Sequence, residues 1–251
     1  MRKIAAEVIA FVLFTLPIVH GQSIKTGDDL LRAMHDRYQS SWYQTVTFTQ
    51  KSTTYKEDGT SSAETWYEAL SAPGKLRIDI GPASSGNGYI FDNGKLTIVK
   101  ANKVVGTHDD FNMLLVLGFD VYCQDSATTA KIAKDQGYDL SKLHEDIWEG
   151  KPAYVVGADK GDLKAKQFWV MKDSLLFVRD IEPSRKDPAE TEDIRFTHYQ
   201  PLAGAWIAAG VEMYVKGRKV FSEDYTDIQA NVKLAAAVYD PEKFAETHWE
   251  K

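Results

Sequence analysis

The chain carries six histidines and one cysteine, the residue types that most often bind metals or act as nucleophiles. The histidines stand at positions 20, 35, 108, 144, 198 and 248. No two have the four-residue spacing that places zinc ligands on one face of a helix. The lone Cys123 can form neither an intrachain disulfide nor a cysteine-based zinc site, and we interpret it as a small buried apolar residue. The sequence therefore predicts no metal site and no cofactor.

Other patterns that carry catalytic chemistry are also weak. The loop at residues 81–88 is rich in glycine and serine, but it lacks the Gly-x-Gly-x-x-Gly pattern and is not followed by a helix. No Gly-x-Ser-x-Gly elbow occurs, and the acidic pairs Asp109-Asp110 and Glu145-Asp146 are typical of solvated faces and helix starts. We therefore predict no catalytic residue and no enzyme. One alternative stays open, a site assembled in space around His144 or His198, because catalytic residues need not be neighbours in sequence.

Composition and charge narrow the class of protein further. The chain has 251 residues, 43% of them hydrophobic and 26% charged, which is typical of a folded domain. Its net charge of −6 would be repelled by a phosphate backbone, so we expect no nucleic-acid partner.

The first residues predict export from the cytoplasm. Arg2 and Lys3 precede an apolar run at residues 8–19, and the small residue Gly21 follows. The run is shorter than the roughly 20 residues needed to span a bilayer, and Pro17 interrupts it. This pattern predicts a cleaved signal peptide at residues 1–21 and a mature domain at residues 22–251. No cysteine lies near the predicted cleavage site, so we expect a soluble periplasmic protein without a lipid anchor.

The elements of the mature chain follow from its hydrophobic periods. A helix is predicted after Thr26, which can cap it, and Leu30, Leu31, Met34 and Tyr38 share one face. From residue 45 onward the period becomes two, with short turns such as Asp92-Asn93-Gly94. About eleven strands follow from this period, at residues 45–49, 65–70, 76–80, 89–91, 96–99, 154–156, 167–171, 175–181, 194–199, 206–215 and 220–228.

Two helices interrupt these strands. The apolar segment at residues 111–119 follows two aspartates that suggest a helix start, and residues 126–136 read as a second helix between a Ser126 cap and Gly137. Because the strands are joined by short turns, the sheet is predicted to be antiparallel.

Several of these features together resemble the LolA/LolB-like superfamily of outer-membrane lipoprotein-sorting proteins. They are the signal peptide, the amphipathic helix, the strand ending Phe48-Thr49-Gln50, and the Pro-Gly-x-x-Arg pattern at residues 73–77. The resemblance implies an α+β, mainly β fold, a curved antiparallel incomplete β-barrel whose helices cover a hydrophobic cavity. Because no lipidated cysteine is present, the chain is similar to the soluble carriers of the superfamily.

The resemblance also implies a function and a site. A carrier of this kind binds acyl chains of a lipoprotein or lipid and delivers them towards the outer membrane, between membrane-associated donor and acceptor proteins; we expect it to be a monomer. Arg77 is the candidate at the mouth of the cavity. The candidate cavity residues are Phe48, Trp66, Leu76, Ile78, Phe91, Leu96, Ile98, Leu114, Leu115, Phe119, Phe168, Phe177, Trp206, Met213 and Phe221.

Ordinary core packing would select the same residues, because any sheet covered by helices needs them. A second function also stays open, a periplasmic sensor or regulatory module that uses the same fold to bind a partner protein. A large dry cavity would favour the carrier, whereas a filled core with an exposed patch would favour the module.

Overall fold

The computed structural model describes residues 23–184 and 187–249. The predicted signal peptide at residues 1–21 lies outside these residues and stays a prediction. The described chain forms one antiparallel sheet of thirteen strands in the order β6-β5-β4-β3-β2-β1-β13-β12-β11-β10-β9-β8-β7. The strands are β1 (Thr45–Tyr55), β2 (Ser61–Ser71), β3 (Lys75–Ile80), β4 (Asn87–Asp92), β5 (Lys95–Lys100), β6 (Lys103–Asp109), β7 (Leu143–Trp148), β8 (Lys151–Val156), β9 (Gln167–Met171), β10 (Phe177–Pro183), β11 (Thr191–Leu202), β12 (Ala205–Val215) and β13 (Arg218–Ala230).

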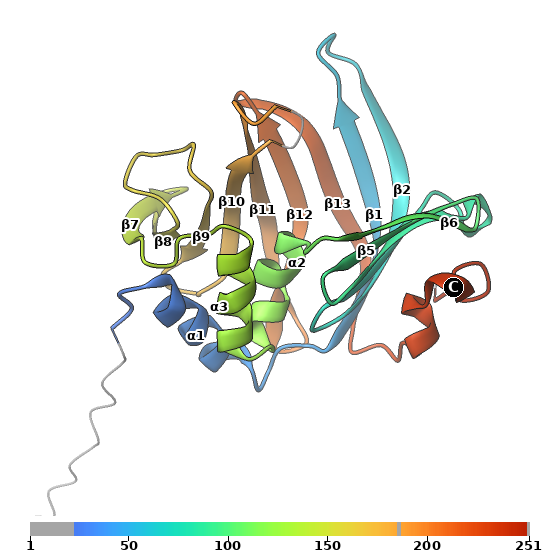
Figure 1. Cartoon of the computed structure of the whole chain (residues 1–251), viewed down its shortest axis with the longest axis horizontal. Coiled ribbons are helices and arrows are strands. Elements are labelled where there is room, and N and C mark those ends of the chain that lie inside the picture. Colours follow the sequence, from blue (N-terminus) through green and yellow to red (C-terminus); the bar gives the residue numbers. More distant parts are fainter. Residues whose placement is uncertain (1–22, 185–186, 250–251) are drawn as a thin grey trace, which may run out of the picture.

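The sheet consists of two meanders that meet in its centre. Strands β1 to β6 form one arm and β7 to β13 the other, and the first and last strands, β1 and β13, pair with each other. The helices α2 (Met113–Gly118) and α3 (Ser126–Asp135) therefore lie on the segment that connects one edge of the sheet to the other. Together with α1 (Gly27–Tyr38) they cover one side of the strongly curved sheet (Figure 1). The fold predicted from the sequence, a mainly β, incomplete barrel with covering helices, is confirmed.

The first helix forms for the reasons that the sequence indicated. Thr26 accepts a hydrogen bond from the backbone N–H of Asp29, whose carboxylate accepts one from the N–H of Thr26 in return, which makes a capping box. Leu30, Leu31 and Met34 are fully buried against the sheet and the other helices. The amphipathic period thus fixes which side of α1 faces the sheet.

The caps of the next two helices differ from the prediction. Asn112, not the aspartate pair before it, caps α2, because its side-chain oxygen accepts hydrogen bonds from the N–H groups of Leu114 and Leu115. Asp125, not Ser126, caps α3 through the N–H of Thr128. Asn and Asp are as effective as Ser at this position, so composition alone could not select the residue.

The prediction of about eleven strands is two short of the observed thirteen. The missing strands are β6 and β7, which are the two edges of the sheet. Neither has a buried residue, and every residue of β6 except Gly106 is exposed. An edge strand with no buried face shows no hydrophobic alternation, so the period of two was absent there.

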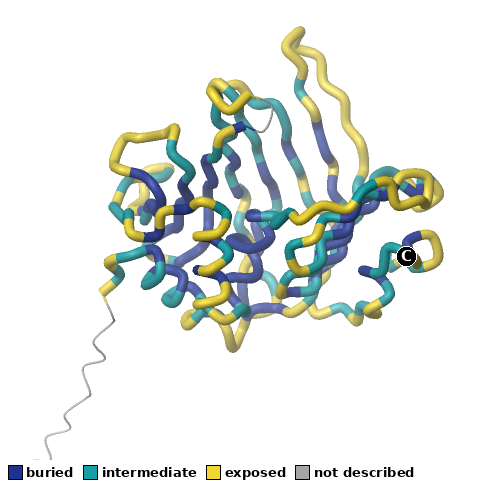
Figure 2. The backbone as a smooth tube through the Cα atoms, viewed as in Figure 1, coloured by how far each residue is buried: buried dark blue, intermediate teal, exposed yellow. Residues whose placement is uncertain are grey.

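The sheet separates two environments, which we call the inner and outer faces. The inner face is the one that α1, α2 and α3 cover, and the large core lies between it and the helices. The outer face of the first arm packs against the C-terminal segment at residues 231–249, where Val238, Tyr239 and Phe244 form a second small core with Ile90 and Val99. Burial is concentrated beneath the helices, whereas the tip of the β1–β2 hairpin is exposed (Figure 2).

Candidate functional site

A cavity of about 70 Å³ lies on the inner face between the sheet and α2. Strands from both arms and the start of α2 contribute to its wall, so it exists only because the two meanders pair through β1 and β13. Most of the lining is apolar, and its described members are Phe48, Glu68, Leu70, Leu76, Ile78, Asn112, Leu114, Leu115, Phe119, Phe196, Val211, Glu223 and Tyr225. In its present size the cavity has room for only a few water molecules.

Two carboxylic acids enter this apolar wall. Glu68 on β2 is only 6% exposed, and Glu223 on β13 lies on the same face. Between their strands, Gln50 of β1 is fully buried and donates a hydrogen bond from Nε2 to Ser52 Oγ at 2.7 Å. Tyr225 donates its hydroxyl to Glu223 Oε2 at 2.5 Å. Among the described residues that line the cavity, none carries a positive charge.

The acids perturb each other because they share one desolvated place. Burial raises the pKa of Glu223 to about 7, and hydrogen bonds from Tyr225 and Gln50 oppose that shift. Burial raises the pKa of Glu68 well above its usual range, and repulsion from Glu223 adds to the effect. A neutral pair is therefore the stable state of the empty cavity at moderately acidic pH.

A second pocket, of about 420 Å³, adjoins the cavity on the other side of α2. Asn112 and Leu115 line both spaces, so this short helix is the wall between them. The pocket also contains Asp120, which is 2% exposed and accepts a hydrogen bond from the N–H of Gly74 at 3.0 Å. Burial raises the pKa of Asp120 to about 7. A volume of this size falls in the range of small-molecule sites.

The residues predicted for the cavity occupy three kinds of position. Those that line it are Phe48, Leu76, Ile78, Leu114, Leu115 and Phe119. Trp66, Met213 and Phe221 are half-buried on the inner face beside it, and the Trp66 and Phe221 rings lie 6.0 Å apart between centroids. Phe91 lines the second pocket, and Leu96 and Ile98 are half-buried near the edge of the first arm. The inner face thus brings together most of the predicted set.

Three predicted cavity residues lie elsewhere. Phe168 and Phe177 are fully buried in the core beneath the helices, where they contact the rings of Tyr138 and Phe196. Trp206 is 36% exposed, whereas its neighbours Ala205 and Ile207 are buried, so it points away from the core. The prediction for Trp206 was wrong by one position along the strand, because neighbouring side chains of a strand point to opposite faces.

Arg77 does not lie at the mouth of the cavity. It is fully buried on the outer face, where Nε and Nη2 donate to the two carboxylate oxygens of Asp79 at 2.8 and 3.0 Å. The guanidinium also donates to the backbone carbonyls of Val238 and Phe244, and it stacks 3.9 Å from the centroid of the Phe244 ring. Arg77 therefore ties the C-terminal segment to the sheet, which a local strand pattern could not reveal.

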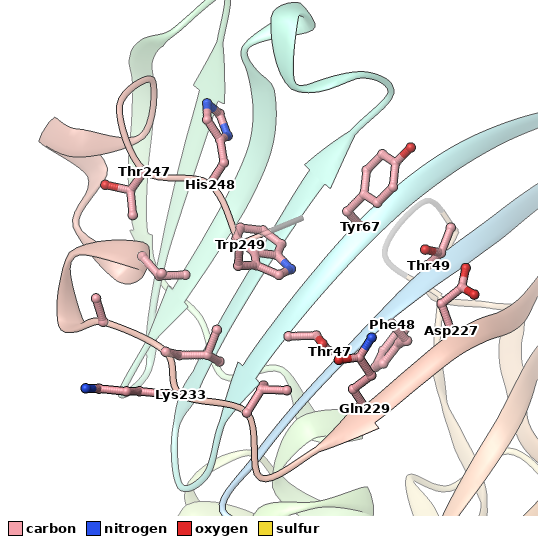
Figure 3. Close-up of a pocket in the computed structure, with 14 residues that line it drawn as sticks. Thr47, Phe48, Thr49, Tyr67, Asp227, Gln229, Lys233, Thr247, His248 and Trp249 are labelled. Atoms are coloured by element: carbon pink, nitrogen blue, oxygen red, sulfur yellow. The ribbon is translucent and has the colours of Figure 1, made fainter. Parts of the chain in front are cut away.

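The outer face has its own groove, of about 620 Å³, between β1, β2, β13 and the C-terminal segment (Figure 3). Its wall combines polar and apolar groups in about equal measure, with Thr47, Asp227 and Gln229 from the strands and Leu234 and Trp249 from the C-terminal segment. A groove of this mixed character suits a peptide, which has a polar backbone and can carry apolar side chains.

The residue types considered first, the histidines and the cysteine, can be placed in the structure. No group of three or more His, Cys, Asp or Glu side chains within residues 23–184 and 187–249 is arranged to hold a metal ion. Burial raises the pKa of Cys123 to about 12, so its thiol is protonated and unreactive at neutral pH. His144 contacts the carbonyl of Ala158, and His198 contacts its neighbour Thr197. Neither histidine lines the cavity. Separately, no described helix is long and apolar enough to cross a membrane.

Sequence reasoning missed the acids of the cavity. Glu68 and Glu223 each interrupt an apolar face at a position where the period of two calls for an inward side chain. That irregularity was the available signal, but a strand shifted by one residue would place both acids in solvent. Only the pairing of β1 with both β2 and β13 decides between the alternatives.

Comparison with known proteins identifies the fold. No protein-family model and no curated protein sequence matches this chain. A domain from Vibrio parahaemolyticus described as an outer membrane lipoprotein-sorting protein aligns with a TM-score of 0.60 and 13% identity, covering 87% of this chain and 98% of that one. A DUF1329 family protein from Desulfovibrio piger aligns with a TM-score of 0.58 and 17% identity, covering 85% of this chain and 95% of that one. A LolA superfamily protein from Nitrosomonas europaea aligns with a TM-score of 0.55 and 13% identity, covering 83% of this chain and 96% of that one.

These alignments span nearly the whole of each solved structure. The chain therefore has the LolA-like fold, and the resemblance that the sequence indicated is confirmed at the level of the fold.

Proposed function

We propose that this protein is a periplasmic carrier that binds an acyl chain on its inner face and releases it to an acceptor at the outer membrane. The observation that carries the proposal is the inner face itself, where an apolar cavity and a larger pocket are separated only by α2. The LolA-like fold supports the same class of function. The signal peptide predicted at residues 1–21 supplies the periplasmic location.

The cavity is too small for a long chain, so binding requires a shift of α2. This helix has six residues, and the consecutive side chains of Leu114 and Leu115 in its first turn line the space that a ligand would fill. Displacing α2 would join the two spaces into one. Each buried CH₂ group contributes about 0.8 kcal/mol, which offsets the cost of opening. Release then needs an acceptor that shields the chain from water equally well.

Native mass spectrometry of the protein purified from its host tests the proposal. We expect a bound lipid-sized mass that organic extraction removes, and binding of an uncharged fluorescent apolar probe by the extracted protein. Leu114→Trp fills the cavity and should weaken probe binding about tenfold or more. Leu163→Trp is the matched control, because Leu163 is an exposed loop residue remote from the cavity lining. Equal probe affinity in both variants would contradict an inner-face site.

A second candidate function is a module that binds a partner protein, and the large outer groove favours it. In that case the probe would fail to bind, and cross-linking in the host through Lys233, an exposed residue of this groove, would capture one defined partner. A carrier would show the opposite result for the probe.

A further inference from the structure

Around Glu68 and Glu223, the inner face presents hydrogen-bond acceptors that lack donors. Glu68 has no hydrogen-bond or ion-pair partner within the described residues, and Glu223 receives the hydroxyl of Tyr225. The side-chain oxygen Oε1 of Gln50, a fully buried residue, has no partner either. A buried acceptor without a donor costs about 1–3 kcal/mol, so such a cluster favours a ligand that brings donors.

Aromatic rings surround the same acceptors. Phe48 stacks on Tyr225 with a centroid separation of 4.2 Å, and Trp66 and Phe221 form the second pair. Trp66 is paired in register with Gln50, and Phe221 stands two residues from Glu223 on the same side of β13. Ring faces attract cations within about 6 Å, and carboxylates attract them more strongly.

An alkyl ammonium group matches both features. It carries a positive charge and three N–H donors when it is a primary amine, and it has no acceptor that would compete for Tyr225. A phosphate or carboxylate head group would instead face two acids with no basic side chain among the described cavity residues. The apolar lining beside the acids accommodates the attached hydrocarbon.

We propose that the inner face selects an apolar ligand that carries a cationic amine, whose nitrogen lies between Glu68, Glu223 and the oxygen of Gln50. This inference rests on the proposed carrier function and specifies its ligand class. The groups that face the nitrogen are Gln50 and Ser52 from β1, Glu68 from β2, Glu223 and Tyr225 from β13, and Asn112 at the start of α2.

The proton balance of binding follows from the empty state. The raised pKa values mean that at least one acid is protonated when the cavity is empty at moderately acidic pH. An ammonium ion takes the place of that proton and leaves two carboxylates. Binding therefore releases protons, and its affinity rises as the pH increases through about 7.

Three ligands of equal chain length, dodecylamine, dodecanol and dodecanoate, test the inference by competition with an uncharged fluorescent apolar probe. At about pH 8 we expect the amine to bind about tenfold or more tightly than the alcohol, and the dodecanoate to bind most weakly. The amine's advantage should shrink towards about pH 5, where both acids are protonated. Calorimetry in buffers of different ionisation enthalpy should detect the released protons in the unmutated protein.

The near-isosteric variants Glu68→Gln and Glu223→Gln should bring the amine down to the affinity of the alcohol. The matched control Glu57→Gln removes a charge at the exposed tip of the β1–β2 hairpin, where Glu57 makes only a loose ion pair with Arg218, and should leave the preference intact. Equal binding of amine and alcohol by the unmutated protein, without proton release, would overturn the inference and leave the carrier function standing. Failure of all three dodecyl compounds to bind would overturn the carrier function as well.

Discussion

Both faces of the sheet bury ionisable side chains, but the surroundings of these side chains differ between the two faces. On the outer face the fully buried Arg77 is paired with Asp79, and two backbone carbonyls accept further hydrogen bonds from its guanidinium. On the inner face Glu68 and Glu223 share an apolar cavity, and none of its described lining residues carries a positive charge. The outer pair finds its hydrogen-bond partners within the chain, so its role is to hold the C-terminal segment against the sheet. The inner pair has no partner of opposite charge among the described lining residues, and this difference is the reason that we propose a ligand site there.

The largest expected effect comes from breaking the outer pair. Arg77→Ala leaves Asp79 buried without a partner and releases the C-terminal segment, so the free energy of unfolding should fall by about 3–5 kcal/mol. Urea denaturation measures the change. Lys95→Ala is the matched control, because the Lys95–Asp109 pair is exposed and should contribute less than about 1 kcal/mol. Similar losses in the two variants would show that the outer pair is not structural.

An intermediate effect is expected on the inner face, where the sign depends on pH. A carboxyl whose pKa is raised by folding binds its proton more tightly in the folded state, so stability falls as the pH rises from the unfolded pKa towards the folded one. For Glu223 this window runs from about 4.5 to about 7. Glu223→Gln should make the free energy of unfolding fall less steeply with rising pH. At about pH 8 the variant should be more stable than the unmutated protein by on the order of 1–3 kcal/mol.

Denaturation series across this pH range measure that slope. Asp120 and Asp180, whose pKa values burial also raises to about 7, maintain the remainder of the decline in the variant. Glu57→Gln should follow the unmutated protein at every pH. An unchanged slope in Glu223→Gln would mean that this carboxyl is solvated, contrary to the comparison between the faces.

The smallest effect sharpens the description of the acid pair. Tyr225→Phe removes the hydroxyl that donates to Glu223, so the pKa of Glu223 should rise further and the free energy of unfolding should fall by about 1 kcal/mol. Nuclear magnetic resonance titration of the labelled glutamate follows the pKa. Tyr214→Phe provides a control, because that hydroxyl donates to Glu212, away from the cavity lining. A lowered pKa of Glu223 would contradict the hydrogen-bond arrangement.

Much of the fold followed from local patterns, and the exceptions have physical reasons. The apolar face of α1, the hairpin turns and the antiparallel strands all arise from neighbours in the chain. The edge strands β6 and β7 were missed because they bury nothing. Trp206 was assigned to the wrong face because aromatic character does not reveal the register of a strand.

The sequence by itself determined the class of architecture, because hydrophobic periods and turn residues act over a few positions. Only the tertiary structure decided the site. Arg77 became structural when a segment more than 150 residues away folded over it. Glu68 and Glu223 became a pair when β1 took its place between β2 and β13. Both outcomes depend on contacts between distant strands, and no local pattern carries the register of such contacts.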